Sequence, residues 1–220
     1  MSFANYFPIW DKLTSEQQER LLSVTMLRQV KAGTMLHNGN SDCLGLLLIR
    51  SGQLRVYTIS DDGREVTLYR LLDMDVCLFS ASCVMPDIQF EVIVEAEKDT
   101  ELWVIPSCIY KEFMNESLPI ATFTNQLISS RFSEIMWLMD QIMWKSFDKR
   151  LAAFLLEESA LEGSTSLKIT HEKIANHMGT AREVVTRMLR YFQSEELVKL
   201  TRGAVELVDV KGMEKLMEEA

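Results

Sequence analysis

The chain has 220 residues, of which 47% are apolar and 25% are charged, and it carries a formal net charge of −9. This composition is close to the average of folded globular proteins and excludes an intrinsically disordered chain. The acidic balance excludes a uniformly basic nucleic-acid-binding protein, and no apolar run approaches the roughly 20 residues of a membrane-spanning helix.

The start of the chain has neither the basic residues nor the long apolar block of a secretory signal peptide. We therefore expect a cytoplasmic protein with no membrane partner. Disulfides are rare in that compartment, so the four cysteines are expected to be thiols.

The first expected helix covers residues 14–27, because Thr14 and Gln17 stand at the spacing of a capping box. From about residue 30 to residue 106, short apolar runs alternate with turn signals. One signal, Asp62-Gly63, separates two apolar runs in the manner of a β-hairpin. This spacing predicts an antiparallel β-sandwich or β-barrel.

After Pro106 the apolar period becomes helical, and one long helix is expected from Leu118 to about Met143. Apolar residues recur there with heptad-like spacing at Ala121, Ile128, Phe132, Ile135, Met139 and Ile142. A second apolar set lies off this seam at Leu127, Trp137, Leu138, Met143 and Trp144. One set can pair with a second copy of the helix while the other packs on the β domain. A single amphipathic helix inside one domain is the alternative.

Residues 145–150 are expected to form a hinge, and residues 151–160 a further helix. The stretch 170–192 then has the pattern of a helix-turn-helix. Thr170 can cap the first helix, Gly179 can end it in the left-handed conformation, and Thr180 with Glu183 can form a capping box for the second helix. A plain helical hairpin is the alternative, but it does not explain the glycine and the caps together.

In a helix-turn-helix, the first turns of the second helix enter the DNA major groove. The expected outward residues there are Arg182, Glu183, Thr186 and Arg187. Arginine can read guanine and glutamate can read cytosine, so we expect Arg182, Glu183 and Arg187 to read base edges. A surface ion pair between Glu183 and Arg187 is the alternative, and both interpretations can hold together.

Two short strands around Arg202-Gly203 are expected to form a wing that contacts DNA phosphates. The residues expected at the DNA backbone are Lys168, Thr170, Thr180, Lys199 and Arg202. The window 165–203 holds seven basic and four acidic residues, a net charge of +3, which permits contact with a polyanion.

No nucleophile–base pair or phosphate-binding loop is evident, so we expect no catalytic activity. The stretch His171-Glu-Lys-Ile-Ala begins like a zinc protease motif, but Ala175 replaces its second histidine. His171 and His177 are six residues apart and are expected on different faces of a helix.

The sequence resembles the Crp/Fnr family of bacterial transcription regulators over nearly its whole length. The likeness lies in "LIRSGQLRVYTISDDGREVTLYRL", "AEKDTELWVI" and "ITHEKIANHMGTAREVVTRMLR". It implies an α+β chain with a sensory β-roll over 1–117, a dimerisation helix over 118–144 and a winged helix-turn-helix over 145–220. It also implies a homodimer that binds palindromic double-stranded DNA with half-sites like TGTGA, and RNA polymerase as a protein partner.

The effector is not implied, because "DVCLFSASCVM" and the residues after it lack the family's polar nucleotide-binding cassette. Phe90 and Glu91 stand where that cassette has an arginine and a hydroxyl residue, so cyclic AMP is not the expected effector. The residues expected to line an apolar pocket, or plain core, are Cys77, Phe79, Ser80, Ser82, Cys83 and Phe90.

Other sensory chemistries stay open at this point. Cys77 and Cys83 could form a redox switch, and Cys43, Cys77, Cys83 and Cys108 could be gathered into a metal or cluster site only by the fold. His37 is the single histidine of the β-rich half that could bind haem. We assign no metal and leave the effector and cofactor unknown. The alternative function is a thiol- or metal-based redox sensor that acts mainly through protein contacts.

Overall fold

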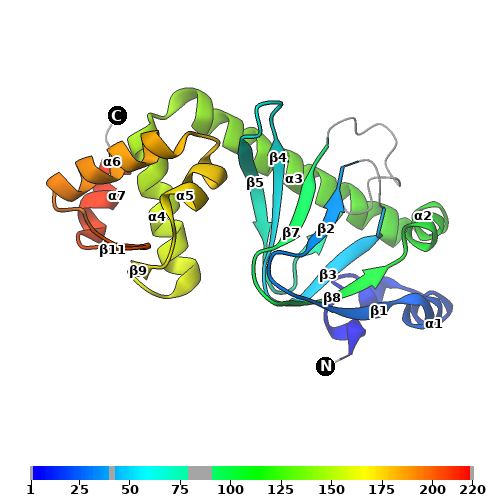
Figure 1. The fold of residues 1–220 in the computed structure, drawn as a ribbon. Helices are drawn as coiled ribbons and strands as arrows, with labels where there is room; N and C mark the ends of the chain where they lie inside the picture. Colours follow the sequence, from blue (N-terminus) through cyan, green and yellow to red (C-terminus); the bar gives the residue numbers. More distant parts are fainter. Residues whose placement is uncertain (1, 40–42, 79–90, 219–220) are drawn as a thin grey trace. The chain divides into compact units, whose positions relative to one another are not determined.

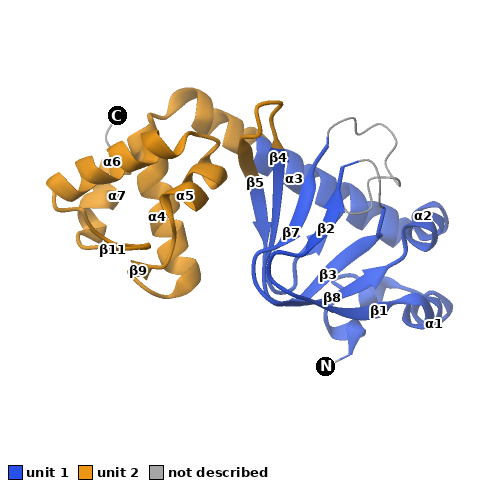
Figure 2. Cartoon of the chain, viewed as in Figure 1, with its two compact units in different colours: residues 1–58, 68–135 blue, residues 59–67, 136–220 orange. Residues whose placement is uncertain are grey.

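The computed structural model describes residues 2–39, 43–78 and 91–218, and Figure 1 shows the chain from its N-terminus in blue to its C-terminus in red. The described residues form two compact units (Figure 2). One comprises residues 1–58 and 68–135, and the other comprises residues 59–67 and 136–220.

The first unit begins with two short 3-10 helices, η1 (Phe3–Asn5) and η2 (Trp10–Lys12), followed by α1 (Ser15–Val24). The predicted capping box is present, since Thr14 Oγ1 accepts from the Gln17 backbone N–H and Gln17 accepts from that of Thr14. The predicted end at residue 27 is wrong. Residues 26–30 instead form β1 (Met26–Val30), which pairs with β8 along its whole length.

The strands of this unit form two four-stranded antiparallel sheets, in the orders β1-β8-β3-β6 and β2-β7-β4-β5. Their bounds are β2 (Met35–Asn38), β3 (Leu46–Ser51), β4 (Leu54–Ile59), β5 (Glu65–Leu71), β6 (Val76–Cys77), β7 (Ile93–Ala96) and β8 (Thr100–Ile105). The hairpin predicted at Asp62-Gly63 joins β4 to β5, and Gly63 has the positive φ of 78° that such a turn requires. This part of the chain is therefore an antiparallel β-roll, as the family resemblance implies.

The two sheets share one apolar core. It contains Leu47 and Ile49 from β3, Leu54 and Val56 from β4, Val94 and Ala96 from β7, and Leu102 and Val104 from β8. The opposite face of β3 packs against η1, α1, α2 (Ser107–Glu116) and the first half of α3 in a second apolar cluster. This double burial explains why β3 has a continuous apolar run rather than an alternating one.

The predicted long helix is α3 (Leu118–Trp144). Its predicted seam is wrong in part, because Ile128 packs against the cluster of η1 and α1, and Ile135 packs against the core between the sheets. The large apolar side chains that α3 leaves exposed are Leu118, Phe132, Met136, Trp137, Met139, Ile142, Met143 and Trp144. Of these, Phe132, Met136, Met139 and Met143 follow spacings of 4, 3 and 4, and we call them the α3 stripe.

The second unit contains α4 (Phe147–Glu162), α5 (His171–Met178), α6 (Arg182–Ser194) and α7 (Val210–Glu218). Its small sheet has the order β10-β11-β9, with β9 (Ser166–Leu167), β10 (Val198–Thr201) and β11 (Ala204–Leu207). The predicted hinge 145–150 is too long, since α4 already begins at Phe147. Only Lys145 and Ser146 separate α4 from α3.

Candidate nucleic-acid interface

Helices α5 and α6 form the helix-turn-helix that the sequence predicts. Thr170 caps α5 by accepting the Lys173 backbone N–H at 3.1 Å, and Gly179 ends the helix with φ 65°. Ile174 and Ala175 of α5 pack in one apolar cluster with Val185 and Leu189 of α6. Ala175 keeps the side chain small where the two helices meet, so the local signals and the packing agree.

The predicted capping box of α6 is wrong. The N-cap residue is Ala181, and no side chain caps the helix. The backbone N–H of Thr180 is used instead to bond the carbonyl of Ala175 at 3.1 Å, which belongs to the C-terminal turn of α5. Helix α6 therefore begins one residue later than predicted, and Arg182 and Glu183 are its first two residues.

The three predicted base-reading residues, Arg182, Glu183 and Arg187, are all exposed, and Thr186 is half-buried. The alternative ion pair between Glu183 and Arg187 does not form, although both side chains belong to the described part of the chain. Their polar groups are therefore presented to solvent from the first two turns of α6, where a partner can reach them.

Two residues that sequence reasoning missed lie beside this face. The Nδ1 atom of His171, the first residue of α5, is 2.9 Å from Thr186 Oγ1. Arg190 is exposed one helical turn beyond Thr186. Burial, then the charges of Arg182 and Arg190, lower the pKa of His171 below the ordinary histidine value. The four-residue spacing of Arg182, Thr186 and Arg190 was the signal that could have revealed this group.

His171 and His177 do have different surroundings, as predicted. His177 is buried, and its ring lies 5.3 Å from that of Phe154 in α4. His171 is bonded to α6. The two histidines therefore form no common ligand pair.

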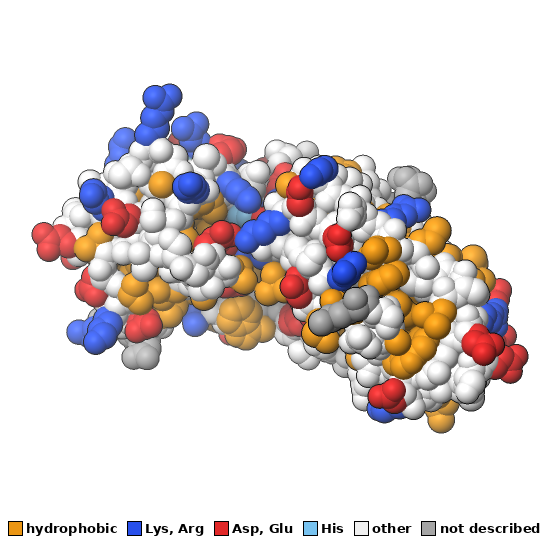
Figure 3. Space-filling view, turned by 90° about the horizontal axis from the view of Figure 1, so that it is seen from below, with side chains coloured by type: hydrophobic (Ala, Val, Ile, Leu, Met, Phe, Trp, Pro, Cys, Tyr) orange, Lys and Arg blue, Asp and Glu red, His pale blue; other side chains and the backbone are white. Residues whose placement is uncertain are grey.

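Strands β10 and β11 form the predicted wing around Arg202-Gly203, and Arg202 and Lys199 are exposed at it. Lys199 pairs across the strands with Glu206, with Nζ 3.7 Å from Oε2. Lys168 and Thr170 are exposed before α5, and Thr180 is half-buried in the turn. In Figure 3, Lys and Arg side chains gather along one edge of the half that contains the helix-turn-helix.

The predicted effector pocket can be traced only in part. Cys77 is fully buried in the core between the two sheets. Phe79, Ser80, Ser82, Cys83 and Phe90 lie outside the described residues. The pocket that these residues were expected to form therefore stays a prediction.

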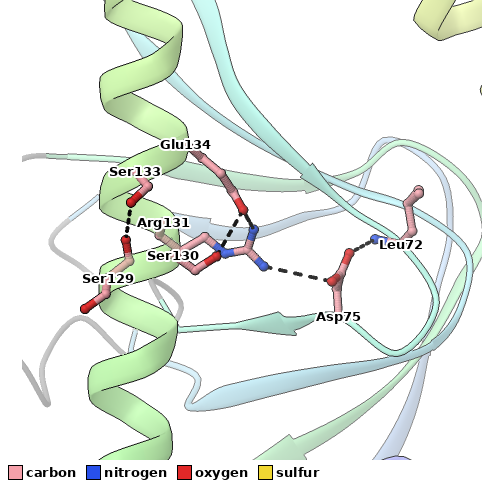
Figure 4. Close-up of polar contacts among 7 residues, drawn as sticks. All are labelled: Leu72, Asp75, Ser129, Ser130, Arg131, Ser133 and Glu134. Atoms are coloured by element: carbon pink, nitrogen blue, oxygen red, sulfur yellow. Dashed lines mark hydrogen bonds and ion pairs between the residues drawn. The ribbon is translucent and has the colours of Figure 1, made fainter.

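A cation that the sequence did not reveal lies on α3 near the core of the β-roll (Figure 4). Arg131 Nη1 donates to both carboxylate oxygens of Glu134, at 2.8 and 2.6 Å, and Arg131 Nη2 lies 4.0 Å from Asp75. Its guanidinium stacks over the ring of Tyr69 at 4.7 Å, and its side chain is only 12% exposed. Asp75 also accepts the Leu72 backbone N–H. Two carboxylates therefore compensate the charge of Arg131.

The expectation that all four cysteines are thiols is wrong, because Cys43 is disulfide-bonded. Cys77 and Cys108 are thiols. Cys83, the other member of the redox switch left open above, lies outside the described residues. Within residues 2–39, 43–78 and 91–218, no group of three or more His, Cys, Asp or Glu side chains is arranged to hold a metal ion. In the same ranges no helix has the length and apolarity to cross a membrane.

A β-roll, a long helix and a winged helix-turn-helix with exposed arginines at its second helix define a DNA-binding transcription regulator with a sensory domain. The Cyclic nucleotide-binding domain family matches residues 27–117, and the Crp-like helix-turn-helix domain family matches residues 149–216. The chain belongs to the Crp/Fnr family of transcription regulators.

Three relatives illustrate the similarity. The chain is 30% identical over 176 residues to the transcriptional regulator SdrP of Thermus thermophilus, covering 77% of this chain and 82% of that protein. It is 24% identical over 209 residues to the cyclic AMP receptor protein of the same organism, covering 95% and 96%. A Crp/Fnr-family crystal structure from Eubacterium rectale has 60% identity and a TM-score of 0.96, covering 98% and 100%. The named relatives are transcription regulators, a class that generally catalyses no reaction.

Proposed function

We propose that this protein is a homodimeric, sequence-specific DNA-binding regulator with a sensory domain over 1–117, a dimerisation helix over 118–144 and a DNA-binding domain over 145–220. The observation that carries the proposal is the exposed set Arg182, Glu183 and Arg187 at the start of α6. A helix pair with only a structural role would not need two arginines and a glutamate free of one another on its outer face.

The α3 stripe supports the homodimer. Its four large side chains are exposed along the helix with heptad spacing, whereas Ile128 and Ile135 are already used by the protomer's own core. An apolar stripe of this kind is stabilised when it pairs with a twin helix. The dimer would present two copies of α6 to the two half-sites of a palindrome about one helical turn of DNA apart.

The proposed contacts divide into two groups. Arg182, Glu183 and Arg187 would read base edges, because they project from the first two turns of α6. The proposed backbone contacts are Lys168, Thr170, Thr180, Lys199 and Arg202. Lys199 would have to leave Glu206 or share it with a phosphate, so Arg202 is the stronger wing candidate.

We propose that cyclic AMP is not the effector of this protein. Arg131 is compensated by Glu134 and Asp75, which makes it a poor partner for a cyclic phosphate. Glu91, at the position where the family's cassette has a hydroxyl residue, is exposed and would repel that anion. RNA polymerase is kept as a proposed protein partner, on the family resemblance alone.

One observation favours a second candidate, a thiol-based redox sensor that acts mainly through protein contacts. Cys43, between β2 and β3, is disulfide-bonded, whereas Cys77 is a buried thiol. Under this alternative, reduction would change the protein without any need for the exposed α6 residues. The variant Cys43→Ser should then mimic reductant, and Arg187→Ala should have no effect.

The decisive experiment is selection of bound duplexes from a random pool by wild type, Arg187→Ala and Arg202→Ala at two salt concentrations. Arg187→Ala should cost about 1–3 kcal/mol per half-site and relax the preference at one G·C pair. Arg202→Ala should weaken all sequences alike and lower the salt slope by about one. If Arg187→Ala retains the full preference, Arg187 does not read bases. If wild type selects no sequence, the proposed function is wrong.

A further inference from the structure

This inference concerns His171 and rests on the proposed DNA-binding function. Arg182, Thr186 and Arg190 follow one another every four residues, so they form a single stripe along α6 about 12 Å long. Both arginines are exposed. His171 reaches this stripe from α5 and is bonded at its midpoint, to Thr186. An ionisable ring is therefore fixed between two permanent cations on the surface that would face DNA.

The free protein disfavours a charge on this ring. Partial burial disfavours the imidazolium most, and the positive charges of Arg182 and Arg190 disfavour it further. Together they lower the pKa of His171 below the ordinary histidine value. The carboxylates of the same two helices, Glu172 and Glu183, are exposed to solvent, where their charge is screened. At neutral pH the ring is therefore neutral in the absence of DNA.

Bound DNA reverses this balance. Guanine acceptors that meet Arg182 and phosphates that approach Arg190 compensate the two cations that repel a proton from the ring. Once protonated, both ring nitrogens donate: Nδ1–H donates to Thr186 Oγ1, and Nε2–H is left for a phosphate oxygen. We propose that His171 is an additional DNA-backbone ligand that binds in its charged form, so that the protein takes up a proton when it binds DNA.

The sign of the pH effect follows from linkage. Because the ring binds a proton more tightly in the complex than in the free protein, DNA affinity must rise as pH falls through the pKa of the complex. The gain levels off once the ring is charged in the free protein as well. Each protomer contributes one such proton, so the affinity for a single half-site should rise about three- to tenfold between pH 8 and pH 6.

The test measures binding of the full-length protein to its selected palindrome by fluorescence anisotropy from pH 6 to pH 8.5 at constant ionic strength. Wild type should show the rise, whereas His171→Gln and His171→Lys should both be nearly independent of pH, the lysine variant because its charge is permanent. Thr186→Ser should keep the wild-type slope, and Thr186→Val should reduce it. Calorimetry in two buffers of different ionisation enthalpy should show proton uptake by wild type and by Thr186→Ser, but not by His171→Gln or His171→Lys.

The outcomes are distinct. Equal pH slopes for wild type and His171→Gln would show that the pH dependence does not arise from His171, and would overturn the inference. The His171→Lys variant keeps the proposal testable if His171→Gln misfolds. A lysine variant with the wild-type pH slope would contradict the proposal as well. If wild type itself binds no palindrome at any pH, the proposed function is refuted instead.

Discussion

The α3 stripe predicts that the double substitution Met136→Glu and Met139→Glu converts the protein to monomers. These side chains are 45% and 47% exposed in the single chain. Burying the exposed half of a methionine contributes about 1 kcal/mol at about 25 cal/mol per Å². Two methionines from each of two protomers therefore contribute about 4 kcal/mol, equivalent to about a thousandfold in the dissociation constant. Four carboxylates facing one another across the seam add repulsion.

The assay is light scattering after size-exclusion chromatography over a series of protein concentrations. Wild type should have twice the 25.3 kDa mass of one chain, and the double variant should have the mass of a single chain. Glutamate is a good helix former, so α3 itself should persist. The matched control is Met26→Glu with Met35→Glu, because these methionines are 47% and 51% exposed on β1 and β2. The control should stay dimeric.

A double variant that stays dimeric at micromolar concentration would refute the reasoning and place the interface elsewhere. Ile135→Glu is not a useful probe, because Ile135 packs against the core between the two sheets. Its replacement would place a charge against that core and destabilise the β-roll, so loss of the dimer would not be specific.

Three further predictions concern the effector and stability. Cyclic AMP at 1 mM should change neither the melting temperature nor the DNA affinity, and a rise of several degrees would show that it binds. Cys77→Ser should lower the free energy of unfolding by about 1–3 kcal/mol in urea under reducing conditions, because its hydroxyl enters an apolar core. The exposed Cys108→Ser is its control and should be nearly neutral; equal effects would show that Cys77 is not buried. Gly179→Ala should cost about 1–2 kcal/mol, since φ is 65° there, and an unchanged melting temperature would contradict that strain.

Local signals in the sequence were reliable where they depend on neighbours in the chain. Thr14 and Thr170 cap their helices, and Gly63 and Gly179 take positive φ, because each feature needs only a few adjacent residues. The same reasoning failed for α6. The Thr180 N–H donates to the Ala175 carbonyl at the end of α5 and is not available to a capping box. Helix α6 therefore begins one residue later.

Long-range pairing overrode local preference in the first helix. Residues 25–27 continue the apolar pattern of α1, yet Met26 and Leu27 pair with Val104 and Trp103 of β8. A sheet partner nearly eighty residues away supplies a ladder of backbone hydrogen bonds along residues 26–30, so these residues leave the helix although Met26 and Leu27 stay exposed. No reading of residues 14–27 alone could have given that boundary.

The sequence by itself determined the antiparallel strands, the long helix, the helix-turn-helix and the exposed α6 residues, because periodicity, turn residues and caps act locally. The resemblance to a known family implied the β-roll. Only the tertiary structure decided which face of α3 is free. Ile128 and Ile135 belong to the predicted seam by spacing, but contacts with distant strands and helices partly bury them. It also decided that His171 bonds Thr186 and that Arg131 meets Asp75, since these partners are 15 and 56 positions apart and only the packing of separate elements brings them together.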